Sequence, residues 1–310
     1  MSQIENALAL KNGALVAFPT ETVYGLGADA SNEKAVARIY EVKGRPQDHP
    51  LILHIASMND ITYWAKDVSD YAIALARVFW PGPMTLIFKR SDAAKEFVTG
   101  GQDTVGLRVP DHSLALGLLQ ECKEIGVHAI AAPSANRFGH VSPTTAVAVQ
   151  EEIGAYLSAQ DLILDGGPAQ VGLESTIIDC TGDTPKILRP GAITQAMIEA
   201  ATGLKVSEDK DSQIRVSGSL EKHYAPNAQI LLDVQASDGQ GFIAPADVVT
   251  PLGAIRLASP TNADEYARTL YSALRDGDAQ GLTTIAIIQP SGDGLAIAIR
   301  DRLIRASKGR

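Results

Sequence analysis

The feature that most constrains the fold of this chain is the alternation of strand-like and helix-like segments through its first 205 residues. Short apolar runs such as ALVAF (14–18) and PLILHIA (50–56) have strand character. Between them, SNEKAVARIYEVK (31–43) carries its apolar residues at helical spacing, and a later helix is expected to open with Pro143 in its first turn. This mixture predicts an α/β or α+β domain through about residue 205.

The alternation stops in residues 205–227, which are polar and without periodicity, and are therefore interpreted as a linker. After them the order is strand (228–233), helix (262–278), strand (283–290) and helix (294–307), which predicts a small parallel α/β domain. We therefore expect a larger first domain over 1–204, a linker over 205–227 and a smaller second domain over 228–310.

The formal net charge of −9 argues against a constitutive nucleic-acid binder, because such proteins usually carry a basic field. Cys122 and Cys180 lie far apart in the sequence; they could form one disulfide, but we expect two reduced, buried thiols in a cytosolic protein. The N-terminus is expected to form a helix, with Ser2 and Glu5 as a capping box and Gly13 as its end, rather than a signal peptide. No apolar run reaches the roughly 18 residues of a membrane span, so we expect a soluble cytoplasmic protein.

The stretch KGRPQDHPLILHI (43–55) places two cations, Lys43 and Arg45, two residues apart on an acidic chain. Pro46 disfavours the helical region for Arg45, which predicts an extended segment that projects both cations to one side. Such a pair suits a polyanion such as a nucleotide triphosphate. The alternative is a solvated helix end, where lysine is favoured by the helix dipole.

Other polar groups follow apolar strands. Thr20 and Thr22 lie in FPTETVYGLGADA (18–30), whose hydroxyl and backbone N–H groups follow a strand, a common place for a binding site. The stretch matches neither common glycine-rich nucleotide fingerprint, and the alternative is a structural loop. Arg108 lies in the apolar strand TVGLRVP (104–110), so it either forms an internal salt bridge or faces a small-molecule carboxylate.

Hydroxyl, amide and guanidinium groups recur in three later loops. Ser134 and Asn136 follow the strand before residue 133, where they either bind phosphate or base or serve ordinary turn chemistry. Ser175 opens a strand, and Arg189 precedes a Pro-Gly turn. The histidines do not cluster at metal-ligand spacings, so no metal site is expected. His54 lies in an apolar strand, and from its position alone it is expected to be a core residue with its hydrogen bonds satisfied.

Seven of these motifs occur in one order: FPTETVYGLGADA, KGRPxxxPLILHI, FWPGPMTLI, GLRVP, APSANRFGHVSPTT, DGGPAQVGLESTIID and LRPGAIT. By these motifs and their order, the sequence resembles the YrdC-like family of threonylcarbamoyl-AMP synthases over residues 5 to 200. The linker motif HYAP and the C-terminal segment resemble the longer, two-domain branch. The resemblance implies an α/β fold with a twisted mixed sheet around a concave basic face, plus a small Rossmann-like C-terminal domain.

The resemblance also implies the reaction. L-threonine, bicarbonate and ATP, the last with Mg²⁺, would give L-threonylcarbamoyladenylate and pyrophosphate. The product would pass to a separate tRNA threonylcarbamoyl transferase complex, with weak or no direct tRNA binding by this chain and no membrane contact. Because the carbamate attacks the α-phosphorus, positioning and charge stabilisation should dominate, which fits the absence of a nucleophilic triad from the motifs.

Site roles follow from the same resemblance. The ATP-binding set is Lys43, Arg45, His49, Ser134, Asn136, Ser142, Arg189 and Tyr224, with Lys43 and Arg45 also catalytic; the threonine-binding set is Thr20, His54, Arg108 and Ser175. Arg108 would bind the threonine carboxylate, and Tyr224 would act as part of a lid. The family motif reads KGRPxxNP, so His49 stands where an asparagine is usual and is a weaker nucleotide contact.

Two other function classes fit parts of the sequence. A concave basic face could belong to an RNA-binding module, which salt-dependent tRNA binding without ATP turnover would reveal. A related carbamoyl-transfer enzyme with another acceptor would accept other amines in place of threonine. A scaffold with decorative loops would require seven motifs to coincide by chance.

Overall fold

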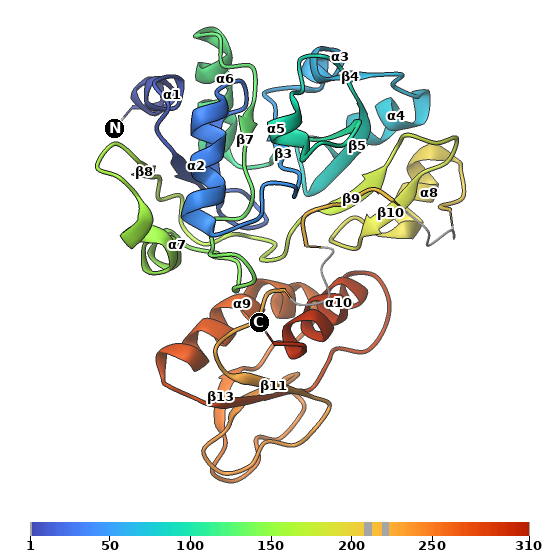
Figure 1. The fold of residues 1–310 in the computed structure, drawn as a ribbon. Coiled ribbons are helices and arrows are strands. Elements are labelled where there is room, and N and C mark those ends of the chain that lie inside the picture. The colour runs from blue at the N-terminus through green and yellow to red at the C-terminus, as the bar shows by residue number, and fades with distance from the viewer. Residues whose placement is uncertain (1, 208–212, 219–222, 310) are drawn as a thin grey trace.

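The computed structural model describes residues 2–207, 213–218 and 223–309, and it contains two sheets with separate cores (Figure 1). The first domain holds the larger sheet, and the orange and red second domain lies against one end of it. The expected linker, 205–227, includes residues 208–212 and 219–222, which lie outside the described part.

Ten strands form the large mixed sheet of the described chain, in the order β10-β9-β5-β6-β3-β7-β2-β1-β8 with β4 paired to β5. The pairs β3–β6, β5–β9 and β1–β8 are parallel, whereas β1–β2, β5–β6 and β9–β10 are antiparallel. The strands are β1 (Val16–Phe18), β2 (Gly25–Asp29), β3 (Ile52–His54), β4 (Ala65–Lys66), β5 (Met84–Arg90), β6 (Thr104–Arg108), β7 (Ile130–Ala131), β8 (Leu162–Ile163), β9 (Thr176–Asp179) and β10 (Lys186–Arg189).

Helices flank this sheet, and several of them begin at a capping side chain. Ser2 and Glu5 form the predicted capping box of the first helix, and the side chains of Asn32 and Thr194 accept N-terminal backbone hydrogen bonds of α2 and α8. The helices of the first domain are α1 (Gln3–Lys11), α2 (Glu33–Lys43), α3 (Ile61–Trp64), α4 (Asp70–Phe79), α5 (Glu96–Thr99), α6 (Ser113–Glu124), α7 (Ala146–Ile153) and α8 (Gln195–Thr202), with short 3₁₀ turns at Met58–Asp60 and Gly154–Tyr156.

Two local predictions were wrong. Lys43 is the last residue of α2 and Gly44 follows with φ 60°, so Lys43 and Arg45 do not share an extended segment. The helix runs through Lys43 and the left-handed Gly44 then turns the chain, so the extended preference that Pro46 imposes on Arg45 does not reach back to Lys43. Pro143 does not lie in the first turn of α7, because Thr145 caps that helix.

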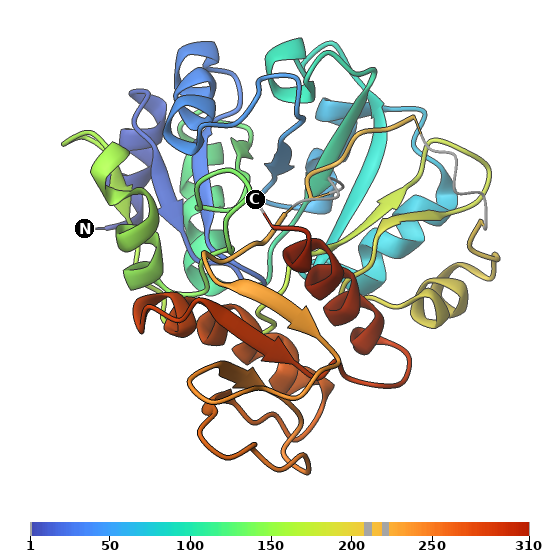
Figure 2. The same ribbon diagram turned by 60° about the horizontal axis from the view of Figure 1, so that its bottom comes forward.

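The second domain is a four-stranded parallel sheet, in the order β11-β14-β12-β13 among the described residues. The predicted elements are present as β11 (Gln229–Leu232), α9 (Ala263–Ala279), β14 (Thr284–Ile287) and α10 (Leu295–Ser307). The strands β12 (Gly241–Ile243) and β13 (Ile255–Ala258) were not predicted, because they are short and lie among Pro- and Gly-rich turns. Helices α9 and α10 lie between this sheet and the first domain (Figures 1 and 2).

One hydrophobic cluster joins the two domains. Val23, Val141 and Leu173 of the first domain pack with buried residues of α9 and α10, including Tyr271 and Leu303. Cys122 and Cys180 are both buried and unpaired by a disulfide, as expected. None of the helices in the described residues is long and apolar enough to cross a bilayer.

Candidate active site

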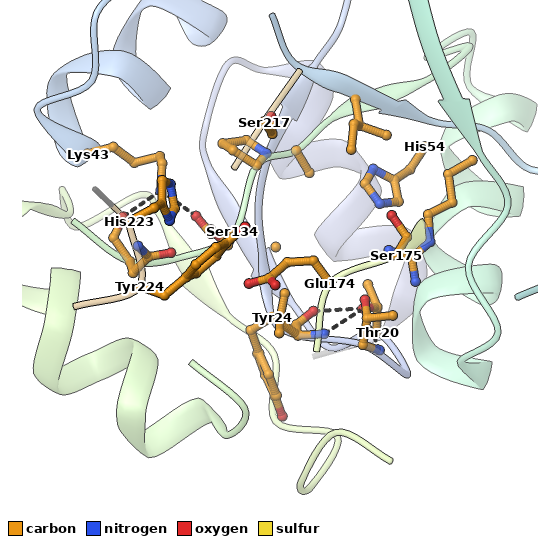
Figure 3. Close-up of a pocket in the computed structure, with 18 of the residues that line it drawn as sticks. Thr20, Tyr24, Lys43, His54, Ser134, Glu174, Ser175, Ser217, His223 and Tyr224 are labelled. Carbon is orange, nitrogen blue, oxygen red and sulfur yellow. Dashed lines mark hydrogen bonds between the residues drawn. The ribbon is translucent and has the colours of Figure 1, made fainter. Parts of the chain in front are cut away.

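A pocket opens where the loops of the first domain meet the linker. Its empty volume, including the solvent-open mouth, is about 630 Å³. It is lined by ten of the twelve residues predicted for the site: Thr20, Lys43, Arg45, His54, Arg108, Ser134, Asn136, Ser175, Arg189 and Tyr224. Figure 3 shows Lys43, Ser134, His223 and Tyr224 on one side, Thr20, His54 and Ser175 on the other, and Glu174 between them.

Lys43 reaches the pocket from the C-terminal end of α2 and is buried, so the helix end is not solvated. Its Nζ donates to the carbonyl oxygens of Ser134 and Asn136, at 2.6 and 2.5 Å. These bonds use two of the three ammonium protons and hold the 134–136 loop against the helix. The lysine therefore retains one donor for a ligand.

Arg45 and Arg189 approach the same pocket from different elements, and the linker residue Ser217 connects them. Arg45 Nη2 lies 3.1 Å from Ser217 Oγ and 2.9 Å from the Pro50 carbonyl oxygen. Arg189, at the end of β10, donates to the Ser217 carbonyl at 2.7 Å and to the Ser175 carbonyl at 2.9 and 3.1 Å. Both guanidinium groups are thereby aimed at one space by backbone carbonyls.

The electrostatic state of these cations favours an anionic ligand. Burial lowers the pKa of Lys43 well below its ordinary value, and the neighbouring charge of Arg45 adds to the shift. Burial also lowers the pKa of Arg45 to about 10 and lowers the pKa of Arg189. Within the described ranges, no carboxylate forms an ion pair with any of the three. Buried positive charge of this kind is stabilised by a bound polyanion.

Arg108, the fourth predicted cation, is paired differently. Its Nη2 lies 2.7 Å from Glu21 Oε1, and both side chains are 5% exposed. Its Nε donates to the Gly82 carbonyl at 3.3 Å. The internal salt bridge foreseen as one alternative is thus present, and Arg108 still lines the pocket.

His54 lies beside Arg108 because β3 and β6 pair in parallel with these two residues in register. Burial lowers the pKa of His54 to about 3, and the charge of Arg108 contributes. The imidazole is therefore neutral at pH 7. Its Nδ1 is buried and has no hydrogen-bond partner among the described residues. A neutral ring with an unused polar atom facing this region suits a hydrogen bond to a ligand.

Two hydroxyl pairs complete this side of the pocket. Thr20 Oγ1 lies 2.8 Å from Thr22 Oγ1 and donates to the Val23 carbonyl at 2.7 Å. Ser175 Oγ lies 2.8 Å from Thr85 Oγ1, next to the guanidinium of Arg189. Thr20 Oγ1 also accepts from the backbone N–H groups of Thr22 and Val23, and Ser175 Oγ accepts from Arg189 Nη2. These local bonds fix both hydroxyl groups at the pocket wall.

The loop that follows β7 presents an amide oxygen. Asn136 donates through Nδ2 to the carbonyls of Arg137 and His140, at 2.7 and 2.9 Å. Its Oδ1 is buried and accepts no hydrogen bond from any described residue. Because the amide nitrogen is already committed, Asn136 offers an acceptor rather than a donor.

Two predicted residues, Ser142 and His49, do not line the pocket. Ser142 is fully buried behind it and donates to Glu174 Oε1 at 2.6 Å. The His49 ring packs edge-on against Phe138, a pocket residue, with centroids 5.4 Å apart. Both therefore adjoin the pocket through another side chain.

Tyr224 is held tightly although it lies in the linker. It is 1% exposed and has φ 62°, which is uncommon outside glycine. Its ring stacks on Tyr271 of α9 with centroids 5.9 Å apart, and the guanidinium of Arg302 lies 5.3 Å from the ring centre. The Tyr224 hydroxyl is buried without a hydrogen-bond partner in the described residues. The ring thus closes one wall of the pocket and presents an unused hydroxyl.

Sequence reasoning missed several groups of this site, namely Glu21, Glu174, Ser217 and His223. Glu21 and Glu174 lie inside recognised motifs, and an acid in so apolar a context was a usable signal of a buried ion pair. Ser217 carries no local signal, because it reaches the pocket only through the path of the linker, whereas His223 stands next to Tyr224 in the HYAP motif, which was a usable signal.

Comparisons with known proteins agree over the whole chain. A family model described as "Telomere recombination" matches residues 8–191, and one described as "Threonylcarbamoyl-AMP synthase, C-terminal domain" matches residues 193–308. The threonylcarbamoyl-AMP synthase of Pyrococcus abyssi is 38% identical over 326 residues, which cover 96% of this chain and 92% of that protein. That of Bacillus subtilis is 38% identical over 336 residues, covering 99% and 94%.

The fold comparison gives the same result. The crystal structure of P. abyssi Sua5 complexed with L-threonine matches with a TM-score of 0.88 and 36% sequence identity, covering 99% of this chain and 95% of that one. The resemblance to the YrdC-like family and the expected two-domain α/β fold are thereby confirmed. The chain belongs to the threonylcarbamoyl-AMP synthase family and, since both family models match it, to the two-domain branch.

Proposed function

We propose that this protein joins L-threonine, bicarbonate and ATP into L-threonylcarbamoyladenylate and pyrophosphate in the pocket described above. The observation that carries the proposal is the convergence of Lys43, Arg45 and Arg189 on one pocket, without carboxylate partners among the described residues. Three buried cations suit a triphosphate, whose charge would offset theirs.

The ATP side of the pocket is assigned to Lys43, Arg45, Ser134, Asn136, Arg189 and Tyr224. We assign the triphosphate to the three cations, whose bonds to backbone carbonyls hold them in place before the ligand arrives. The free acceptor of Asn136 suits a donor such as a ribose hydroxyl or the adenine amino group, not a phosphate oxygen. Ser142 and His49 support this side from behind.

The threonine side is assigned to Thr20, His54, Arg108 and Ser175. The carboxylate of threonine would take a place beside Arg108, whose guanidinium is already fixed by Glu21 and Gly82. The neutral His54 and the hydroxyls of Thr20 and Ser175 offer hydrogen bonds to the substrate hydroxyl and amine. These assignments bring the substrate amine next to the ATP side.

The chemistry follows from that arrangement. The threonine amine adds to bicarbonate-derived carbon dioxide to give a carbamate, and a carbamate oxygen then attacks the α-phosphorus while pyrophosphate leaves. Lys43, Arg45 and Arg189 stabilise the charge that develops on the phosphate oxygens and on the leaving pyrophosphate. No side chain has to form a covalent intermediate.

Magnesium is proposed to arrive as part of the MgATP substrate. The described residues contain no group of three His, Cys, Asp or Glu side chains placed to hold a metal ion. Glu174, the carboxylate that lines the pocket, already accepts bonds from Ser142, Tyr271 and Arg302. The triphosphate oxygens are then the main ligands of the ion, as hard cations prefer.

The linker, proposed as residues 205–227 between domains 1–204 and 228–310, acts as a lid over the pocket. Ser217, His223 and Tyr224 line the pocket from the linker. A lid that excludes water would protect the carbamate and the mixed anhydride from hydrolysis. Transfer of the product to a tRNA threonylcarbamoyl transferase complex, weak or absent tRNA binding, and a cytoplasmic location belong to the same proposal.

One assay tests the proposal: release of pyrophosphate from ATP and bicarbonate, with and without threonine, together with mass detection of threonylcarbamoyl-AMP. We expect product only when all three substrates are present. Pyrophosphate release that does not depend on threonine would contradict the proposal. Equal turnover with other amines would favour a carbamoyl-transfer enzyme with a different acceptor.

A further inference from the structure

A buried charged network links the second domain to the pocket wall. Arg302 on α10, whose side chain is fully buried, donates from Nε to Glu174 Oε2 at 2.9 Å. Tyr271 on α9 donates to the same oxygen at 3.0 Å, and Ser142 donates to Oε1 at 2.6 Å. Arg302 also donates to the Pro190 carbonyl at 3.0 Å and to Asp301 Oδ2 at 2.6 Å, and Asp301 has a second cation, Arg305, beside it. Two helices of the second domain therefore fix one carboxylate of the first.

The position of Glu174 makes its charge important for ligand binding. It lies between the ATP side and the threonine side of the pocket (Figure 3). An uncompensated carboxylate there would repel a triphosphate and would compete for Arg189, the nearby cation assigned to ATP. A counter-ion behind Glu174 removes that repulsion and leaves Arg189 available to the ligand.

We propose that Arg302 is a positioning residue for ATP binding: it neutralises Glu174 and holds it against Ser142, so that the second domain sets the electrostatics of a pocket in the first. The proposal rests on the function proposed above. It gives α10 a defined part in the reaction without contact between Arg302 and the substrates.

Two further observations agree with this role. Burial alone would raise the pKa of Glu174, but the charges of Arg302 and Arg189 and the Ser142 hydrogen bond lower it to about 2, so the carboxylate stays charged and paired. The guanidinium of Arg302 also lies over the ring of Tyr224, so the same residue braces the lid tyrosine.

The test uses the full-length chain with the variants Arg302→Met, Glu174→Gln/Arg302→Met and, as a matched control on the same helix, Arg300→Met. Arg300 donates to the Pro290 carbonyl at 2.8 Å and is not part of the pocket. The measurements are ATP binding by calorimetry, the KM for ATP and for threonine, kcat, and thermal unfolding.

We expect Arg302→Met to weaken ATP binding and raise the KM for ATP at least tenfold, with a smaller effect on kcat. The double variant should recover most of that loss, because a neutral amide in place of the Glu174 carboxylate no longer repels the triphosphate. Arg300→Met should bind ATP within about threefold of wild type. If Arg302→Met alone does not fold, the double variant decides: recovery of both folding and ATP binding supports the proposal.

Two results would overturn it. One is an Arg302→Met protein that binds ATP as wild type does, and the other is a folded double variant whose ATP binding is as weak as that of the single variant. Failure of the proposed function is a different outcome, because the wild-type protein would then release no threonine-dependent pyrophosphate.

Discussion

Arg108 Nη2 lies 2.7 Å from Glu21 Oε1, and both side chains are almost fully buried. Neither carboxylate oxygen of Glu21 has a hydrogen bond of normal geometry within the described residues, so the contact is an ion pair without a well-aligned N–H. The guanidinium therefore retains directed donors. This pair is the reason to regard Arg108 as a pre-oriented receptor for a second carboxylate, that of threonine.

The first prediction concerns the geometry of that receptor. Arg108→Lys keeps the positive charge beside Glu21 but removes the planar fork that grips a carboxylate. We expect the KM for threonine to rise about tenfold or more, which corresponds to about 1.4 kcal/mol of lost binding. Steady-state assays of pyrophosphate release at saturating ATP would measure the change.

The control for this variant is Arg90→Lys, at the partly exposed Arg90 that pairs loosely with Glu96 and Asp103. It should leave the KM for threonine unchanged. An Arg108→Lys protein with wild-type threonine dependence would remove Arg108 from the carboxylate site. Arg108→Ala is the poorer probe, because it leaves Glu21 buried and unpaired at a cost of about 3–5 kcal/mol of stability.

The second prediction concerns the ATP side. Lys43→Ala and Arg45→Ala each remove a buried donor from the proposed triphosphate site, and Lys43→Ala also releases the carbonyls of Ser134 and Asn136. We expect threonine-dependent pyrophosphate release to fall about 100-fold or more in each. Lys34→Ala, at an exposed position on the same helix as Lys43, is the control. Wild-type rates in either test variant would exclude that residue from catalysis.

The sequence predicted the order of elements well where periodicity and caps agree. The α2 helix with its Asn32 cap and the β6 strand are examples, because their signals are local. It failed for the pair Lys43 and Arg45, because α2 continues through Lys43 and the left-handed Gly44 turns the chain between the two residues. It also missed β12 and β13, whose three and four residues are too short to show a pattern.

The candidate site divides in the same way. Residues inside motifs, such as Arg108 and Asn136, could be chosen from the sequence because the family resemblance marks them. The partners that set their chemistry could not, because they are distant along the chain. Ser217 lies 172 residues from Arg45, and Arg302 lies 128 residues from Glu174. Contacts of that kind are made by the fold and leave no local pattern.

The third prediction concerns pH. Burial lowers the pKa of His54 to about 3, so the native ring stays neutral while the unfolded ring takes up a proton below its ordinary value of 6.5. The unfolded state then binds more protons, and stability falls as the pH falls from 6.5 toward 3. Between pH 7 and pH 5 this group removes about 2 kcal/mol of the free energy of unfolding.

Urea unfolding of wild type and His54→Asn at pH 7 and pH 5 measures this effect. The variant should lose about 2 kcal/mol less than wild type over that interval. His128→Asn, at an exposed ring, is the control and should follow wild type. This pH interval avoids the titration of Glu174. The pKa of that carboxyl group is lowered from 4.5 to about 2 in the folded protein, so its contribution to stability is lost only below pH 5. Equal pH dependence of His54→Asn and wild type would contradict the prediction.

The last prediction distinguishes a role of the Tyr224 hydroxyl in ATP binding from a role of the Tyr224 ring in stability. The Tyr224 hydroxyl is buried without a partner in the described part of the chain, although its ring packs on Tyr271 and Arg302. Tyr224→Phe keeps the ring contacts and removes an unsatisfied polar atom, so the melting temperature of the free protein should stay the same or rise. If the hydroxyl serves ATP, binding of ATP should weaken about tenfold while stability does not fall.

Gly218→Ala is the matched disruptive variant. Gly218 has φ 81°, and a β-carbon there would lie 2.0 Å from the Tyr224 hydroxyl oxygen, so the alanine would displace the ring or the linker. We expect it to weaken ATP binding and also to lower the melting temperature. Calorimetric ATP binding and thermal unfolding of both variants show whether the Tyr224 hydroxyl contributes to ATP binding. If the hydroxyl does not contact ATP, Tyr224→Phe should bind ATP as tightly as wild type does. That result would confine Tyr224 to the wall of the pocket.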